Sequence, residues 1–178
     1  MRTPSRFMPQ FPEERPHPFL KWVFAIGFLS ISAILILISP YILRPLILIM
    51  FIGVAGDILE KRRIKRLANA RAGESICTFA RLMNAKNLDT HVVRAVYEEI
   101  GKRLSKPDSI FPLRPTDQLF KAKDLNLDDE DLYELLIAIT FRTKRSLENT
   151  RSNPYFNKIE TVSDLVQFVM AQPRITNS

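Results

Sequence analysis

The sequence predicts an all-α protein, with an N-terminal transmembrane helical hairpin followed by a small helical bundle. Residues 22–56 contain one charged residue, Arg44, and form a run longer than the ~20 residues that one membrane-spanning helix needs. Further along the chain, apolar residues recur in four stripes with helical spacing. Alternation typical of strands is sparse, so the helical prediction covers both parts of the chain.

Prolines divide the apolar run into two arms. Ser39-Pro40 and Arg44-Pro45 interrupt it, and proline removes a backbone donor and clashes with the preceding turn. We therefore expect arms near residues 20–38 and 46–59, joined by a turn over 39–45. A cleaved signal peptide is disfavoured because the run is too long and lacks a small-x-small cleavage site. A buried hairpin of a soluble protein would normally show a polar stripe, which the first arm lacks.

The positive charge is concentrated beside the apolar run. The formal net charge is +7, yet residues 67–178 carry 16 basic and 15 acidic residues. A nucleic-acid-binding domain would carry the excess on its folded part. The positive-inside tendency instead predicts a multi-pass protein of the cytoplasmic (inner) membrane with both termini cytoplasmic. The predicted lipid-headgroup contacts, at ~1 kcal/mol each, are Lys61, Arg62, Arg63, Lys65 and Arg66.

The predicted helices of the C-terminal part follow the four apolar stripes. Possible capping boxes begin the third stripe at Asp128 and the fourth at Thr161, while prolines exclude a continuous helix over 106–120. We expect Cys77 to pack beside the first stripe and His91 to be exposed. The stripes are Ile76, Phe79, Ala80 and Met83; Val92, Val93, Val96, Ile100 and Leu104; Leu132, Leu135, Leu136 and Ile139; and Val162, Leu165, Val166 and Val169.

Two stretches in this order resemble the acyl carrier protein family. DQLFKAKDLNLDDEDLYELLIAI (117–139) is similar to the family's leucine-containing loop and acidic helix, and NKIETVSDLVQFV (157–169) is similar to its final helix. The resemblance implies an acyl-carrier-like four-helix domain over 89–171. The full predicted organisation is a cytoplasmic tail (1–19), the hairpin (20–59), a basic juxtamembrane segment and linker helix (60–88), this domain, and a flexible tail (172–178).

The chain departs from the family at the residue that carries the prosthetic group. Carrier proteins attach phosphopantetheine to a serine at the start of the acidic helix, and Asp129 occupies that position here. A carboxylate does not form that phosphodiester, so we expect no cofactor. Ser109 and Ser146 are the alternative attachment points, although neither has the family's sequence context.

The predicted function is that of a membrane-tethered, non-catalytic interaction module that docks a basic protein partner through its acidic helix. The alternatives are a genuine acyl carrier that uses an atypical serine, and an immunity or inhibitor-type membrane protein whose anchor is the active part. We expect no enzyme activity, no metal and no nucleic-acid partner, because no residues with suitable spacing stand out. The predicted partner-binding residues are Asp124, Asp128, Asp129, Glu130, Asp131 and Glu134.

Overall fold

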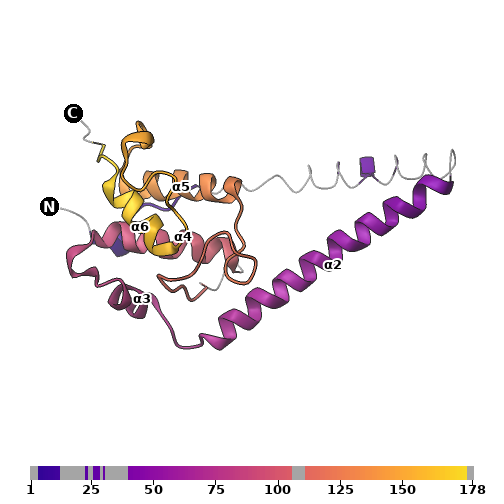
Figure 1. The fold of residues 1–178 in the computed structure, drawn as a ribbon, viewed down its shortest axis with the longest axis horizontal. Helices are drawn as coiled ribbons and strands as arrows, with labels where there is room; N and C mark the ends of the chain where they lie inside the picture. The colour runs from indigo at the N-terminus through magenta and orange to yellow at the C-terminus, as the bar shows by residue number, and fades with distance from the viewer. Residues whose placement is uncertain are drawn as a thin grey trace. The chain divides into compact units, whose positions relative to one another are not determined.

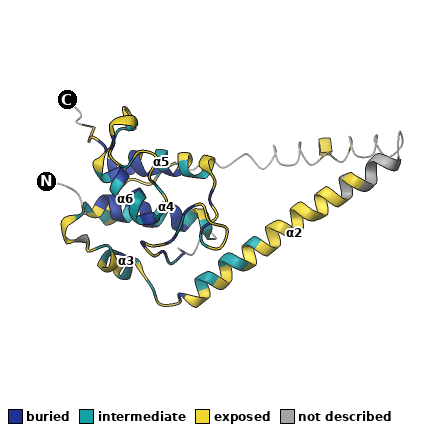
Figure 2. Cartoon of the chain, in the orientation of Figure 1, coloured by how far each residue is buried: buried dark blue, intermediate teal, exposed yellow. Residues whose placement is uncertain are grey.

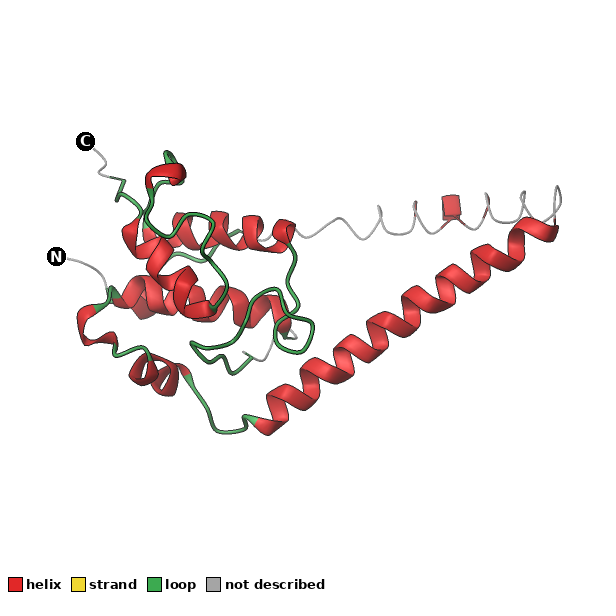
Figure 3. Ribbon diagram, viewed as in Figure 1, coloured by secondary structure: helices red, strands yellow, loops and turns green. Residues whose placement is uncertain are grey.

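The computed structural model describes residues 4–12, 23, 26–28, 30, 40–105 and 111–175. This part of the chain consists of helices and loops with two isolated β-bridges, which confirms the all-α prediction (Figure 3). The elements are η1 (Ser5–Phe7), α2 (Pro40–Ala70), α3 (Ile76–Leu82), η2 (Ala85–Asn87), α4 (Thr90–Leu104), α5 (Asp129–Thr143), η3 (Thr150–Ser152) and α6 (Val162–Ala171).

The chain divides into two compact units. One contains the residues up to Phe11 together with those from Arg66 onward, and the other contains Pro12–Lys65. The four predicted stripes correspond to α3, α4, α5 and α6 of the first unit. Within 89–171 the structure has three α-helices and the short 3₁₀ helix η3 among the described residues. We call the first unit the folded domain.

Helix α2 differs from the predicted hairpin in its bounds. The turn expected over 39–45 is helical from Pro40, and Pro45 lies inside the helix. The helix start accommodates Pro40, because the first N–H groups of a helix have no intrahelical acceptor, whereas Pro45 is the sixth residue of α2 and removes one intrahelical hydrogen bond. The first arm lies largely outside the described residues. Among the residues that are described, no helix has both the length and the apolar character needed to cross a membrane.

Helix α4 is the centre of the folded domain. It packs against α5, α6 and α3, and the first two contacts are visible in Figure 1. Figure 2 shows buried residues along α4, α5 and α6. Leu135, predicted to be a core residue, is 5% exposed. The proline-bearing loop between α4 and α5 adds apolar side chains to the core, which the sequence did not predict: Phe111, Leu113, Leu119, Leu125 and Leu127.

Both predicted capping boxes are present. Asp131 N donates to Asp128 Oδ1 (2.7 Å), and Asp164 N donates to Thr161 Oγ1 (3.2 Å). In each case the third residue's carboxylate also accepts from the cap residue's backbone, so two free N–H groups are satisfied at once. Asp89 caps α4 through His91 N (3.0 Å), a cap that the sequence analysis missed.

Several residues lie in surroundings that differ from the predictions. His91 is buried rather than exposed, because it lies in the first turn of the central helix α4. Cys77 is exposed rather than packed. The predicted flexible tail is held as far as Ile175, because Ser146 N donates to Pro173 O (2.9 Å) and Ile175 N donates to Lys144 O (2.9 Å). Residues 176–178 lie outside the described residues.

The predicted N-terminal tail also differs. Residues 4–11 belong to the folded domain, where Met8 is only 6% exposed. They contact α4 and α5 through side chains that are far away in sequence. Residues 13–19 of the predicted tail lie outside the described residues.

Candidate functional site

The candidate site is the first turn of α5 and the groove beside it. The acidic residues predicted to bind a partner do gather here, but they have different surroundings. Asp128 and Asp131 form the capping box described above. Asp124 accepts a hydrogen bond from Gln118 N at 3.4 Å. These carboxylates therefore contribute to local structure, as the predicted capping box at Asp128 already indicated for the start of α5.

Arg103 of α4 compensates two of the acids. Its guanidinium pairs with Asp131 and, at 3.1 Å, with Glu134. Burial alone would lower the pKa of Arg103, but its hydrogen bond and charge interaction with Asp131, with smaller effects of Glu134 and Asp128, raise this pKa above its ordinary value. The sequence of the acidic segment does not reveal this compensation, because the arginine lies on the neighbouring helix α4.

Asp129 and Glu130 remain as exposed acids. Neither side chain makes a hydrogen bond or an ion pair with the described part of the chain. Both lie in the first turn of α5, where the helix dipole favours negative charge. The dipole explains why acids are tolerated there, and it leaves both carboxylates available to a ligand in solvent.

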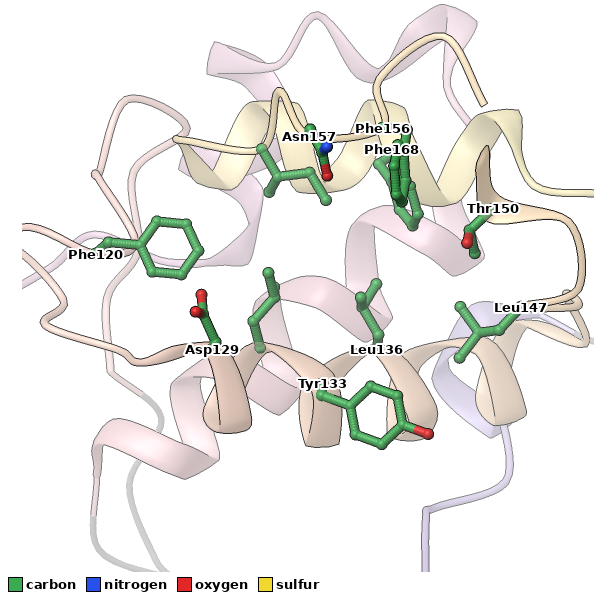
Figure 4. A pocket seen from close by; sticks show the side chains of 11 residues that line it. Phe120, Asp129, Tyr133, Leu136, Leu147, Thr150, Phe156, Asn157 and Phe168 are labelled. Carbon is green, nitrogen blue, oxygen red and sulfur yellow. The ribbon is translucent and has the colours of Figure 1, made fainter. Parts of the chain in front are cut away.

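An apolar groove opens next to Asp129. It has a volume of about 560 Å³, and Figure 4 shows side chains from α5 facing those of α6 and the loop before it. Leu132 and Leu136, predicted as core residues, line it and are only partly buried. The lining residues are Phe120, Asp129, Leu132, Tyr133, Leu136, Leu147, Thr150, Phe156, Asn157, Ile159 and Phe168.

Hydrogen bonds to the backbone hold the loops that line the groove. Leu119 N donates to Glu160 O (2.9 Å) and Leu127 N donates to Leu119 O (2.8 Å), which fixes the loop that carries Phe120. On the other wall, Asn153 Nδ2 donates to Phe168 O at 2.9 Å. Asn153 is itself buried, so this contact ties the loop after η3 to α6. The groove is thus built by tertiary contacts that helical periodicity does not reveal.

Exposed aromatic side chains lie on the same side as the free acids. Tyr133 is 64% exposed and Phe120 is 39% exposed, and both line the groove. Figure 4 shows Asp129 between Phe120 and the start of α5. An exposed surface that combines apolar groups and carboxylates has the composition of a recognition site.

Buried ion pairs support the folded domain, and those of Arg71 and Arg142 join residues far apart in sequence. Arg71 donates to both carboxylate oxygens of Asp117, each at 2.7 Å, and also to Pro112 O at 3.1 Å. Arg142 binds both Glu98 and Glu99. The partners are 43 to 46 positions apart in sequence, so local patterns did not identify them. Their role is to join elements, and none of these side chains lines the groove.

The described part of the chain contains no candidate metal-binding cluster. There, no three His, Cys, Asp or Glu side chains form a group that could hold a metal ion. Ser146 is partly buried after α5, and its Oγ accepts from Glu148 N at 3.0 Å. Ser109, the other alternative attachment point, lies outside the described residues.

The basic run lies in the last turns of α2. Arg63 pairs with Glu60 at 2.5 Å, whereas Lys61, Arg62, Lys65 and Arg66 are exposed. Four of the five predicted lipid-headgroup residues therefore have exposed side chains.

No protein-family profile, curated protein or solved structure matches the chain. The likeness to acyl carrier proteins therefore rests on the two sequence stretches described above.

Proposed function

We propose that this chain is a membrane-tethered, non-catalytic interaction module with an acyl-carrier-like domain, and that this domain docks a basic protein partner at the first turn of α5. One observation carries the docking part. Of the six acids around this turn, Asp129 and Glu130 are the exposed pair without a hydrogen-bond or ion-pair partner in the described structure. Asp129 lines an open apolar groove, and Glu130 is the next residue in the same helical turn.

The geometry favours a partner that presents both positive charge and an apolar side chain. The free carboxylates attract cationic groups and raise the encounter rate. The exposed ring of Tyr133 offers apolar contact area, and aromatic side chains are frequent binding hot spots. Asp129 at the position of the carrier serine agrees with a role that needs no prosthetic group.

The membrane part of the proposal rests on the apolar run and on α2. In the described section of α2 the consecutive apolar residues from Leu48 to Ile52 are all exposed, at 48–71% of their residue surface. Their positions cover every face of the helix, which in water would leave a large apolar surface uncovered. A lipid environment would accommodate this surface, and the exposed basic residues that follow suit anionic headgroups.

The hairpin topology has separate support. Residues 4–11 and the described residues from 66 to 175 belong to one folded domain, so both ends of the intervening segment are attached to this domain. A segment that returns to the same domain is consistent with an even number of crossings and with termini on one side. We therefore propose a location at the cytoplasmic membrane, with the domain and residues 4–11 both in the cytoplasm.

A photo-crosslinking experiment tests the docking site. A photoreactive residue replaces Tyr133 in the full chain, and the protein that it captures in membranes is identified. Changing Glu130→Lys should reduce capture several-fold at low salt, with a smaller effect at high salt because exposed charges are screened. Glu134 is left unchanged because it pairs with Arg103.

Glu148→Lys is the matched control. Glu148 is exposed and follows the C-terminal end of α5, whereas Glu130 lies in the first turn of this helix, which is ~20 Å long at 1.5 Å per residue. The substitution Glu148→Lys makes the same charge change as Glu130→Lys and should leave capture of the partner protein unchanged. Equal capture by the unchanged chain, Glu130→Lys and Glu148→Lys would refute the docking site. A gain of one phosphopantetheine in intact mass, after co-expression with a transferase, would instead establish the atypical carrier function.

A further inference from the structure

Residues 4–11 lie on a face of the folded domain that is built by α4 and α5. The chain there reads PSRFMPQF and begins with the 3₁₀ helix η1. Four contacts hold it, two from side chains of α4 and two from side chains of α5. We call this surface the α4–α5 face.

Polar contacts fix the backbone of the segment and its side chains. Arg94 Nε donates to Ser5 Oγ at 3.2 Å, and Lys102 Nζ donates to Gln10 Oε1 at 2.6 Å. Arg142 Nε donates to the backbone carbonyl of Pro9 at 3.2 Å. The donors occupy two different helices, so the segment bridges them.

Apolar contacts fill the space between these hydrogen bonds. Met8 is 6% exposed, although it lies in a short segment at the domain surface. The ring of Phe11 packs edge-on against Phe141, with centroids 5.6 Å apart and planes at 83°. In contrast, Phe7 is 69% exposed and makes little contact with the domain. The segment therefore binds the α4–α5 face through particular side chains, as a peptide ligand would.

The contact with Arg142 shows that the domain is incomplete without the segment. The Arg142 side chain is 1% exposed, and Glu98 and Glu99 bind its two terminal nitrogens. Its third donor, Nε, points to Pro9 O. Removing the segment would take the acceptor from this donor, and a buried donor without an acceptor is costly.

We propose that residues 4–11 are a clasp, an intrachain peptide ligand of the α4–α5 face that closes residues 12–65 into a loop. The occupant of the face is this segment of the same chain. Supplying the ligand on the same chain gives it a high effective concentration, so a few contacts suffice to keep the loop closed. The clasp uses only contacts within the folded domain, and it is independent of the docking site on α5.

Cross-linking of the full chain tests the clasp. In a Cys77→Ser background, Phe11→Cys and Phe141→Cys are combined and treated with a short bis-maleimide. We expect the cross-linked peptide to be found by mass spectrometry in the monomer band of a denaturing gel. The control combines Phe11→Cys with Phe120→Cys, because Phe120 is also exposed but lines the groove. This pair should give no more product than the single-cysteine proteins.

A second pair of variants separates the clasp from chance proximity. Met8→Asp, added to the Phe11–Phe141 cysteine pair, should reduce the cross-link several-fold, whereas Phe7→Asp should not. In the chain without introduced cysteines, Met8→Asp should also speed hydrogen exchange in α4 relative to Phe7→Asp. Equal cross-linking at positions 141 and 120, or equal exchange in both aspartate variants, would overturn the clasp. A cross-link confined to the dimer band would assign the segment to a second copy and overturn its intrachain character.

Discussion

The substitution Asp117→Asn tests whether the buried pair with Arg71 holds the folded domain together. The two side chains are 4% and 8% exposed, and the carboxylate accepts two guanidinium hydrogen bonds at 2.7 Å and one from Arg114 N at 2.8 Å. Asparagine keeps the shape but removes the charge, so the Arg71 guanidinium stays buried without its counter-ion. Breaking a buried pair by removing one partner costs ~3–5 kcal/mol.

This loss of free energy corresponds to a measurable shift in the urea midpoint of unfolding. With an m-value of ~2 kcal/mol/M in urea for a small domain, a loss of ~4 kcal/mol lowers the unfolding midpoint by ~2 M. Pulse proteolysis of the full chain in detergent at increasing urea measures this midpoint. Glu148→Gln is the control, and as an exposed substitution it should change the free energy of unfolding by less than ~0.5 kcal/mol.

A double substitution sharpens the result. Arg71→Met combined with Asp117→Leu replaces the pair with apolar groups, and such replacements are often neutral or stabilising. The double variant should therefore be more stable than Asp117→Asn alone. A cost below ~1 kcal/mol for Asp117→Asn would show that the pair does not hold the loop to the residues after α2.

Two further predictions concern the core and the stability of the folded domain at low pH. Leu135→Ala should cost ~2–5 kcal/mol in the same unfolding assay, because it truncates a side chain that is 5% exposed; a loss below ~0.5 kcal/mol would place Leu135 outside the core. The hydrogen bond from Arg114, with smaller charge effects of Arg114 and Arg71, lowers the pKa of Glu74 below its ordinary value of 4.5. The stabilisation of the fold by the ionised Glu74 is then present above pH 4.5 and is lost as the pH falls through the folded-state pKa. The difference in free energy of unfolding between the native chain and Glu74→Gln should therefore shrink on acidification. A difference that stays constant with pH would contradict the pairing.

The sequence predicts the helices well because their signals are local. The stripe that begins at Val162 and the capping box at Thr161 lie within a few residues of each other, and the structure confirms both. The same holds for the start of α5 at Asp128. Such patterns depend on hydrogen bonds and burial inside one helix, so neighbouring elements do not have to be known in advance.

The tertiary features could not be predicted, because they depend on contacts between residues far apart in sequence. Arg103 compensates the acids from α4, and Arg71 meets Asp117 across 46 positions. The clasp joins Pro9 to Arg142 across 133 positions. The groove likewise needs Leu136 of α5 and Phe168 of α6 to face each other across a gap. A helical stripe assigns Leu136 to an apolar face without telling whether that face is filled, and no predicted stripe includes Phe168.

The central claim, a membrane-tethered domain with residues 4–11 on the same side, is tested most directly by labelling two cysteines in sealed, inverted membrane vesicles. Cys77 is the single native cysteine and is exposed, so it reports on the folded domain. Phe7→Cys in a Cys77→Ser background reports on the clasp, because Phe7 is 69% exposed. We predict that the chain sediments with the vesicles and that an impermeant maleimide labels both positions. Labelling of one position alone, or recovery of the chain in the soluble fraction, would contradict the claim.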